Sequence, residues 1–325
     1  MAPLRSALVT AHKSQNGGVD VYSGAVDGEW VIKGVPNGGY VLGLAIQACT
    51  QRQASTSHPD IIHLTGHFLQ AASPAPIDVH ISVLKTGKQF TNLSASLVQQ
   101  GKSRITTHII FGSLAPSVGL GIPPNSPYAR RHPLHVHPSK AIETRTVPRW
   151  GFAKHVRWSR DPFLHSQNFP DSLTRTNSET VGGGGLFWGV WFQLTDPEAT
   201  ITPAVISLIA DTIINSPLLL PKEERGGTPS DMWFATLTMA LEYKCPIPPP
   251  SADHAARTVG VFSSGTFWGE PSGRHDVYVE IWTAPAELGD SRPVDPDWRD
   301  KQLCLATSTQ MALCISARPE AKTKL

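Results

Sequence analysis

The apolar residues between positions 202 and 217 recur with the spacing of a helix and not with the alternation of a strand. Thr202 is a suitable N-cap, Pro203 is well placed in a first helical turn, and Pro217 follows as a stop signal. This stretch therefore predicts a helix of roughly 20 Å that begins at Thr202 and stops at Asn215-Ser216-Pro217. Its aliphatic side chains cover most of the circumference, so we expect the helix to be buried.

Asp211 is the one charged residue on this predicted helix. It shares a face with Ser207, four residues before it, and with Asn215, four residues after it, which makes a narrow polar stripe. A buried carboxylate is costly unless it is paired or solvated. We therefore expect a hydrogen-bonding partner or a wet crevice at Asp211, because an acidic residue has few structural roles on an apolar helix.

An earlier helix is predicted where Gly38 and Gly39 precede apolar residues at helical spacing, from Tyr40 to Ala48. Glycines at a helix start allow close backbone packing, and the free N–H groups of that turn are able to bind a ligand oxygen. The sequence leaves both interpretations open. The residues after this helix alternate and predict antiparallel strands over 61–69, 77–84, 90–99 and 103–111.

Residues 112–149 are rich in proline and lack periodicity, as is typical of a connector. We therefore predict an N-terminal domain over 1–114, a proline-rich linker over 115–148 and a C-terminal domain over 149–325. Apolar segments of the second part predict strands over 186–192, 232–243, 257–267, 276–283 and 302–316.

The order of helix and strands thus occurs twice, and the two predicted helices align without a gap. Residues 39–47 lie over 203–211, which sets Gln47 opposite Asp211. Two later segments also correspond, each ending in a glutamine, Gln99 or Gln310. Because a helix needs a sheet to cover it, we predict an α+β fold of two antiparallel sheets, each wrapped around a central helix. The half that carries Asp211 is expected to hold the chemistry.

Composition narrows the class of protein. The chain has 325 residues, 40% of them hydrophobic, which is enough for two cores. Its net charge of +2 and the lack of a basic run predict no nucleic-acid partner. No apolar run approaches the ~20 residues of a membrane span. The terminal Thr323-Lys324-Leu325 resembles the peroxisomal signal Ser-Lys-Leu, so we expect a cytoplasmic or peroxisomal protein.

Metal binding and disulfide chemistry are not predicted. His132, His135 and His137 stand close together in the linker, but no acidic residue or cysteine accompanies them. The four cysteines are scattered without metal-ligand or redox spacing, which favours free thiols in a reducing compartment.

Two polar residues on later strands complete a pattern with Asp211. Thr236 lies in a Thr-Leu-Thr segment that runs on to Pro246, and Gln310 ends an Ala-Thr-Ser-Thr-Gln segment. With these residues the chain resembles the type II acyl-CoA thioesterases, especially their fungal thioesterase-like branch, from about Gly24 to Ser316.

The resemblance implies a double hot-dog fold and the hydrolysis of acyl-CoA, or another acyl thioester, to the free acid and CoA. It implies that Asp211, Thr236 and Gln310 hold the hydrolytic water, without a metal or organic cofactor. By analogy with hot-dog folds, the amides of Gly38 or Gly39 are expected to bind the thioester oxygen. Hot-dog domains often pair through their sheets, so a homo-oligomer is a further expectation.

Strand alternation is compatible with such a site. Thr236 is expected on one face with Phe234 and Thr238, and Gln310 on a face of small residues that includes Ala306 and Ala312. Taken singly, a threonine in a strand reflects β-propensity more often than catalysis, and a glutamine is more often a satisfied buried amide.

Two departures from the family pattern motivate an alternative. The family has Asp-His where this chain has Thr238-Met239, and Glu-Gly where it has Met311-Ala312. A non-catalytic double hot-dog protein that binds an acyl or polyketide-like ligand, or a tailoring enzyme on the same scaffold, is therefore the competing hypothesis. Thiol release from acyl-CoAs separates the alternatives.

Overall fold

One 14-stranded antiparallel sheet runs through the computed structural model, which describes residues 3–115, 121–123, 126–144, 150–224, 232–270 and 272–316. The first half of the chain contributes α1 (Leu4–Ala7), β1 (Thr10–Asn16), β2 (Val19–Ala25), β3 (Val31–Ile32), β4 (Val35–Pro36), α2 (Gly38–Gln53), β5 (Asp60–Phe68), β6 (Pro76–Thr86), β7 (Thr91–Gln99) and β8 (Lys102–Gly112). The second half contributes η1 (Pro138–Lys140), β9 (Glu143–Thr144), η2 (Gly151–His155), β10 (Val156–Arg160), α3 (Pro162–Ser166), β11 (Leu186–Leu194), α4 (Pro203–Ala210), η3 (Ser216–Leu218), η4 (Lys222–Glu224), β12 (Met232–Tyr243), β13 (Thr258–Gly265), β14 (Trp268–Gly269), β15 (Arg274–Thr283), η5 (Trp298–Lys301) and β16 (Cys304–Ser316).

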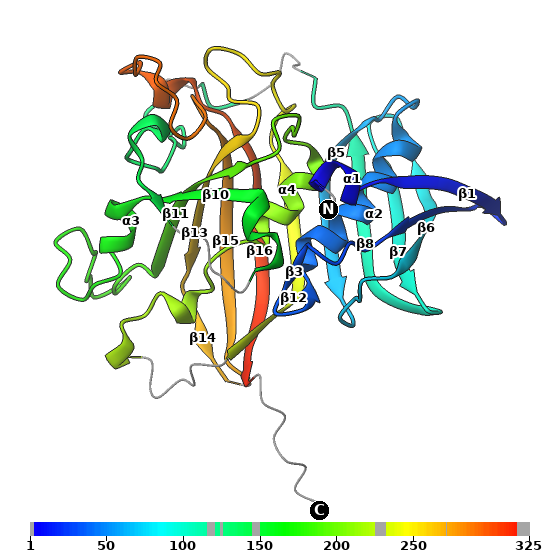
Figure 1. The fold of residues 1–325 in the computed structure, drawn as a ribbon, viewed down its shortest axis with the longest axis horizontal. Helices are drawn as coiled ribbons and strands as arrows, with labels where there is room; N and C mark the ends of the chain where they lie inside the picture. The colour runs from blue at the N-terminus through cyan, green and yellow to red at the C-terminus, as the bar shows by residue number, and fades with distance from the viewer. Residues whose placement is uncertain are drawn as a thin grey trace, which may run out of the picture.

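The strand order repeats between the two halves, which lie side by side in Figure 1, blue to cyan and green to red. From the edge of the sheet toward its middle, the first half runs β1-β2-β6-β7-β8-β5. The second half runs β9-β10-β11-β13-β15-β16-β12, so it has the same order with the short strand β9 added at its edge. The internal repeat predicted from the sequence is therefore present in the topology. One predicted correspondence is wrong: β7 with Gln99 matches β15 by position, whereas β16 with Gln310 matches β8.

The prediction of two separate sheets needs a correction. Strands β5 and β12 pair across the boundary between the halves, with Leu64 opposite Leu241 and Gly66 opposite Met239, so a single sheet contains both halves. This pairing satisfies the backbone N–H and C=O groups that each half would otherwise leave unpaired at its innermost strand. A separate two-stranded ribbon, β3-β4, leads into α2.

Helices α2 and α4 pack closely and antiparallel, and small residues make this contact possible. A Cβ on Gly39 would overlap the Ser207 carbonyl, and one on Gly43 would lie 2.9 Å from the Ala204 carbonyl oxygen. The Ser207 hydroxyl donates to the Gly39 carbonyl oxygen at 2.7 Å. Gly39 and Gly43 therefore allow the two helices to pack closely. Close packing is one of the two roles that the sequence left open for the glycines at the start of α2, the other being ligand binding.

Helix α4 begins as predicted and ends earlier. Thr202 caps it by accepting a hydrogen bond from the Val205 N–H, but the helix stops at Ala210 and Asp211 is its C-cap. The Ala210 oxygen, one of the last carbonyl groups of the helix, accepts instead from the Gln310 side chain at 2.8 Å. The prediction that the helix continues past Asp211 to the stop signal at Asn215-Ser216-Pro217 is wrong, and the carboxylate lies at a helix end.

The described part of the proline-rich connector, 126–144, packs on the second half. His132 is 4% exposed and stacks on Trp191 with ring centroids 5.0 Å apart. Burial lowers the pKa of His132 to about 3, so the ring is neutral. His137 instead caps η1 by accepting from the Ser139 N–H. Within the described ranges, no helix is long and apolar enough to cross a membrane.

Candidate active site

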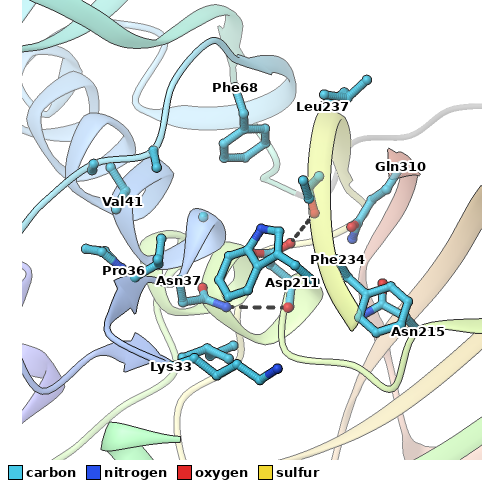
Figure 2. Close-up of a pocket in the computed structure, with 18 of the residues that line it drawn as sticks. Lys33, Pro36, Asn37, Val41, Phe68, Asp211, Asn215, Phe234, Leu237 and Gln310 are labelled. Atoms are coloured by element: carbon cyan, nitrogen blue, oxygen red, sulfur yellow. Dashed lines mark hydrogen bonds between the residues drawn. The ribbon is translucent and has the colours of Figure 1, made fainter. Parts of the chain in front are cut away.

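A cavity of about 630 Å³ opens where the N-terminus of α2 meets the C-terminus of α4 (Figure 2). Its volume falls in the range of small-molecule sites, and most of its wall is apolar. The wall is formed by Ile32, Lys33, Val35, Pro36, Asn37, Gly38, Val41, Phe68, Leu69, Gln70, Ala71, Ala72, Ile105, Trp150, Asp211, Ile213, Ile214, Asn215, Leu218, Met232, Trp233, Phe234, Ala235, Thr236, Leu237 and Gln310. Both halves of the chain supply this wall, so the cavity exists only when they are joined.

Asp211 is the only carboxylate among the described residues of this wall. Its Oδ2 accepts from the Gly39 N–H at 2.8 Å, and its Oδ1 accepts from the Thr236 hydroxyl at 3.0 Å. The Asn37 amide donates to the Asp211 main-chain oxygen at 3.4 Å (Figure 2). The sequence predicts either a hydrogen-bonding partner or a crevice at this carboxylate, and Asp211 has hydrogen-bonding partners and also lines the cavity.

Two opposing effects act on the Asp211 carboxyl. Burial raises its pKa from 3.8 to about 6, because the surrounding protein disfavours the charged form. The hydrogen bonds from the Gly39 N–H, the Thr236 hydroxyl and the Gly38 N–H lower the pKa and limit this rise. Asp211 is therefore ionised at neutral pH and close enough to titration to take up a proton.

Thr236 faces Asp211 because of a β-bulge. Thr236 pairs with Ala312 and Thr238 pairs with Met311, so Leu237 is an extra residue in β12. Past the bulge the side chains change faces. Phe234 and Thr236 are on one face as predicted, but Thr238 is not on it, which corrects the simple alternation used for the prediction.

Gln310 lies on the same face of the sheet as Thr236, since its partner Met239 follows the bulge. The side chain is 7% exposed and its Nε2 donates to the Ala210 carbonyl oxygen at 2.8 Å. With that nitrogen engaged, the Gln310 Oε1 is the atom available to accept a hydrogen bond from a molecule in the cavity. The buried face with Ala306 and Ala312 is the one predicted for it.

Gly38 and Gly39 lie at the start of α2, opposite Asp211. The Gly39 N–H donates to the carboxylate, and the Gly38 N–H lowers the same pKa by a hydrogen bond. In this structure both amides thus serve Asp211. The positive end of the α2 dipole also points at the carboxylate.

The sequence interpretation missed Asn37. It is the N-cap of α2, accepts from the Tyr40 N–H at 2.8 Å and also contacts Asp211. An asparagine directly before a glycine pair and a helical pattern is the signal that would have found it.

The sequence predicts Asn215 on the same polar stripe as Asp211. In the structure Asn215 lines the cavity and lies beside the buried His275. The His275 Nδ1 lies 3.0 Å from the Gly273 carbonyl oxygen, so it must carry the proton and donate. The His275 Nε2 lies 3.3 Å from the Asn215 Oδ1. Burial lowers the pKa of this histidine.

A metal would need a different set of ligands. Within the residues that the structure describes, no group of three or more His, Cys, Asp and Glu residues is arranged to hold an ion. The four cysteines are free thiols.

Comparison with known proteins finds similarity to a family model in the first half of the chain. Residues 26–112 match the family model of the acyl-CoA thioesterase N-terminal domain. A stretch of 88 residues is 35% identical to the ustilagic acid biosynthesis cluster protein orf2 of Mycosarcoma maydis. That match spans 26% of this chain and 22% of the relative's length.

Solved structures match nearly the whole chain. A putative thioesterase II from Thermobifida fusca is similar over 96% of this chain and 97% of its own, with a TM-score of 0.64 and 19% identity. Acyl-CoA thioesterase II TesB2 from Mycobacterium marinum is similar over 96% of this chain and 98% of its own, with a TM-score of 0.61 and 15% identity. A conserved protein with a hot-dog fold from Alicyclobacillus acidocaldarius is similar over 97% of this chain and 98% of its own, with a TM-score of 0.65 and 16% identity.

At these identities the structural likeness establishes the fold alone. The protein has a hot-dog fold with a large antiparallel sheet and few helices. The resemblance to the type II acyl-CoA thioesterases that was predicted from the sequence is confirmed, by the family model in the first half and by the fold over the whole chain.

Proposed function

We propose that this protein is an acyl-CoA thioesterase that hydrolyses an acyl thioester to the free acid and CoA with an activated water. The observation that carries the proposal is the convergence of Asp211, Thr236 and Gln310, from α4, β12 and β16, on the wall of one apolar cavity. We further propose that the halves are two hot-dog units of a double hot-dog protein. They would correspond to 1–114 and 149–325, joined by 115–148.

In the proposed mechanism, a water molecule sits between Asp211 and the Gln310 Oε1 and donates a hydrogen bond to each. Its lone pair then points at the thioester carbonyl carbon. As the C–O bond forms, Asp211 accepts the proton, which a carboxyl with a pKa of about 6 does efficiently near neutral pH. The Thr236 hydroxyl holds Asp211 in place by donating to its Oδ1.

The negative charge then develops on the carbonyl oxygen, and the N-terminus of α2 is the nearest positive end of a helix dipole. Both amides hydrogen-bond the ionised Asp211, so we assign the oxyanion contact to the Gly38 N–H once Asp211 has taken up the proton, while the Gly39 N–H keeps Asp211 in position. When the tetrahedral intermediate collapses, the C–S bond breaks and Asp211 returns its proton to the thiolate of CoA. No metal or organic cofactor has a step in this scheme.

Hydrolysis of a panel of acyl-CoAs, followed by the release of free thiol, tests the proposed function. We expect turnover with at least one acyl-CoA of the panel. Binding of these compounds with no thiol release would contradict the proposal and favour the non-catalytic alternative. Release of a modified acyl-CoA, with the thioester intact, would favour a tailoring enzyme.

The pH dependence should report the Asp211 pKa. Asp211 acts as a base in its ionised form. On the acid side of pH 6, the acid limb of the profile, kcat/KM should therefore fall about tenfold for each unit of decreasing pH. In Thr236→Val the limb should move to higher pH, because the lost hydrogen bond stabilises the ionised form. Measuring kcat/KM from pH 4 to 8 checks this. A limb that stays in place in Thr236→Val contradicts the assigned contact.

Three expectations from the sequence remain predictions. The terminal Thr323-Lys324-Leu325 lies outside the described residues, and we propose on the sequence alone a peroxisomal or cytoplasmic location. A homo-oligomer formed through the sheets and the lack of a nucleic-acid partner are likewise carried forward as proposals.

A further inference from the structure

Leu218 lines both the main cavity and a second, smaller one. The second cavity has a volume of about 190 Å³ and is lined by His165, Asn168, Phe169 and residues 218–221. Leu218 is the residue that both walls share. The leucine therefore borders both cavities.

The turn that carries Leu218 is anchored on both sides of it. Ser216 and Leu219 are 5% and 9% exposed, and Ser216 packs so tightly on Gly265 that no Cβ fits there. The Leu218 N–H donates to the Asn215 carbonyl oxygen at 2.9 Å. Leu218 itself is 40% exposed. A fixed backbone with one outstanding aliphatic side chain makes a rigid partition.

The wall of the second cavity suits a hydrocarbon chain. Leucine, proline and phenylalanine side chains form most of it. The Asn168 amide is engaged by Phe187 on both sides, donating to its carbonyl oxygen at 2.8 Å and accepting from its N–H at 2.7 Å. The polarity of Asn168 is therefore already satisfied. Among the described residues of this wall, the His165 Nδ1 is the buried polar side-chain atom that has no hydrogen-bond partner, and the remaining leucine, proline and phenylalanine side chains favour apolar ligand atoms.

We propose that Leu218 limits the length of the acyl chain that this site accepts, and that the second cavity is the space into which a longer chain would extend. This inference rests on the proposed function, since the reacting carbonyl must lie at Asp211. Asp211 and Leu218 line the same cavity, so a chain that starts at the carboxylate reaches the partition along an apolar wall.

Leu218→Ala should extend the substrate range to longer chains. In a series of saturated acyl-CoAs, we expect kcat/KM of the variant to continue rising by about fourfold per methylene beyond the native optimum. Leu303→Ala is the matched control, because Leu303 is 41% exposed and lines neither cavity. Its chain-length profile should equal the native one.

A second variant shows where the extra chain lies. In Leu218→Ala/Leu219→Phe the larger ring fills part of the second cavity, so the gain with long chains should be lost. A gain that persists in the double variant, or an unchanged profile in Leu218→Ala, overturns the proposal.

The same comparison with free fatty acids, by displacement of an environment-sensitive apolar dye, needs no hydrolysis. If the native protein releases no thiol but the length limit in this binding assay moves with Leu218, the proposed function fails and the partition stands. If the native protein hydrolyses acyl-CoA but Leu218→Ala changes the chain-length limit neither in hydrolysis nor in binding, the proposed function stands and only the proposed role of Leu218 is contradicted.

Discussion

Asp211→Asn is expected to lower kcat/KM for acyl-CoA by about 10²- to 10⁴-fold, the usual contribution of a general base. Asparagine keeps the shape of the side chain and can still accept from the Gly39 N–H, but it cannot take the proton of the attacking water. Thiol release under single-turnover conditions measures the effect. Asp171→Asn, on an exposed residue outside the cavity, is the control and should keep native activity.

The same variant should differ from the native protein in the pH dependence of its stability. The folded-state pKa of Asp211 is raised, so the native protein is favoured below pH 3.8 and loses that advantage as the pH rises through about 6. Asparagine does not titrate. The free energy of unfolding of Asp211→Asn relative to native should therefore increase between pH 4 and 7, by up to about 3 kcal/mol.

Denaturant titrations at several pH values measure this difference. Full turnover by Asp211→Asn would remove the assigned role even if the protein is a thioesterase. A flat stability difference would show that the carboxyl is not held in the low-dielectric setting described here.

Gly39→Ala is expected to have the largest effect on the fold. The added Cβ would overlap the Ser207 carbonyl oxygen, lie 2.9 Å from its carbonyl carbon and 2.6 Å from the Asp211 Cβ. Because two backbones and the carboxylate side chain are involved, α2 and α4 must separate. We expect a loss of about 3 kcal/mol or more in the free energy of unfolding, at the upper end of overpacking effects.

Gly269→Ala is the matched control for this change. A Cβ at Gly269 meets no atom within 4 Å, and the stability should stay within about 0.5 kcal/mol of native. If Gly39→Ala folds, its activity should fall along with its stability, because the Gly39 N–H would move away from Asp211. A stable and fully active Gly39→Ala would contradict the close contact between the helices.

Most of the strands were predictable because one face of each is buried. The pattern predicted β12 at its observed bounds, Met232–Tyr243, and β5 to β8 within a few residues. The strand β1 was missed because six of its seven residues are polar or charged at an edge of the sheet, where alternation is weak. The joining of the two halves was not predictable, because pairing between β5 and β12 uses backbone groups that are alike in every strand.

The sequence was sufficient to predict which residues form the candidate site, but not how the backbone arranges them in space. Asp211 was identified by a charge among apolar neighbours, and Thr236 and Gln310 by resemblance. The last carbonyl group of α4 accepts a hydrogen bond from the Gln310 side chain, which is 100 residues away in sequence. The bulge at Leu237 has no local signal in the sequence, yet it decides that Thr236 and not Thr238 faces the carboxylate.

The pairing of β5 with β12 also constrains how the molecule moves. A hinge that opened the cavity by swinging one half from the other would have to break this ladder and the α2–α4 contact together. The two halves are therefore expected to behave as one rigid body around Asp211. Entry of the acyl chain and escape of the acid must then depend on local motion of side chains that line the cavity, and not on a change in the angle between the halves.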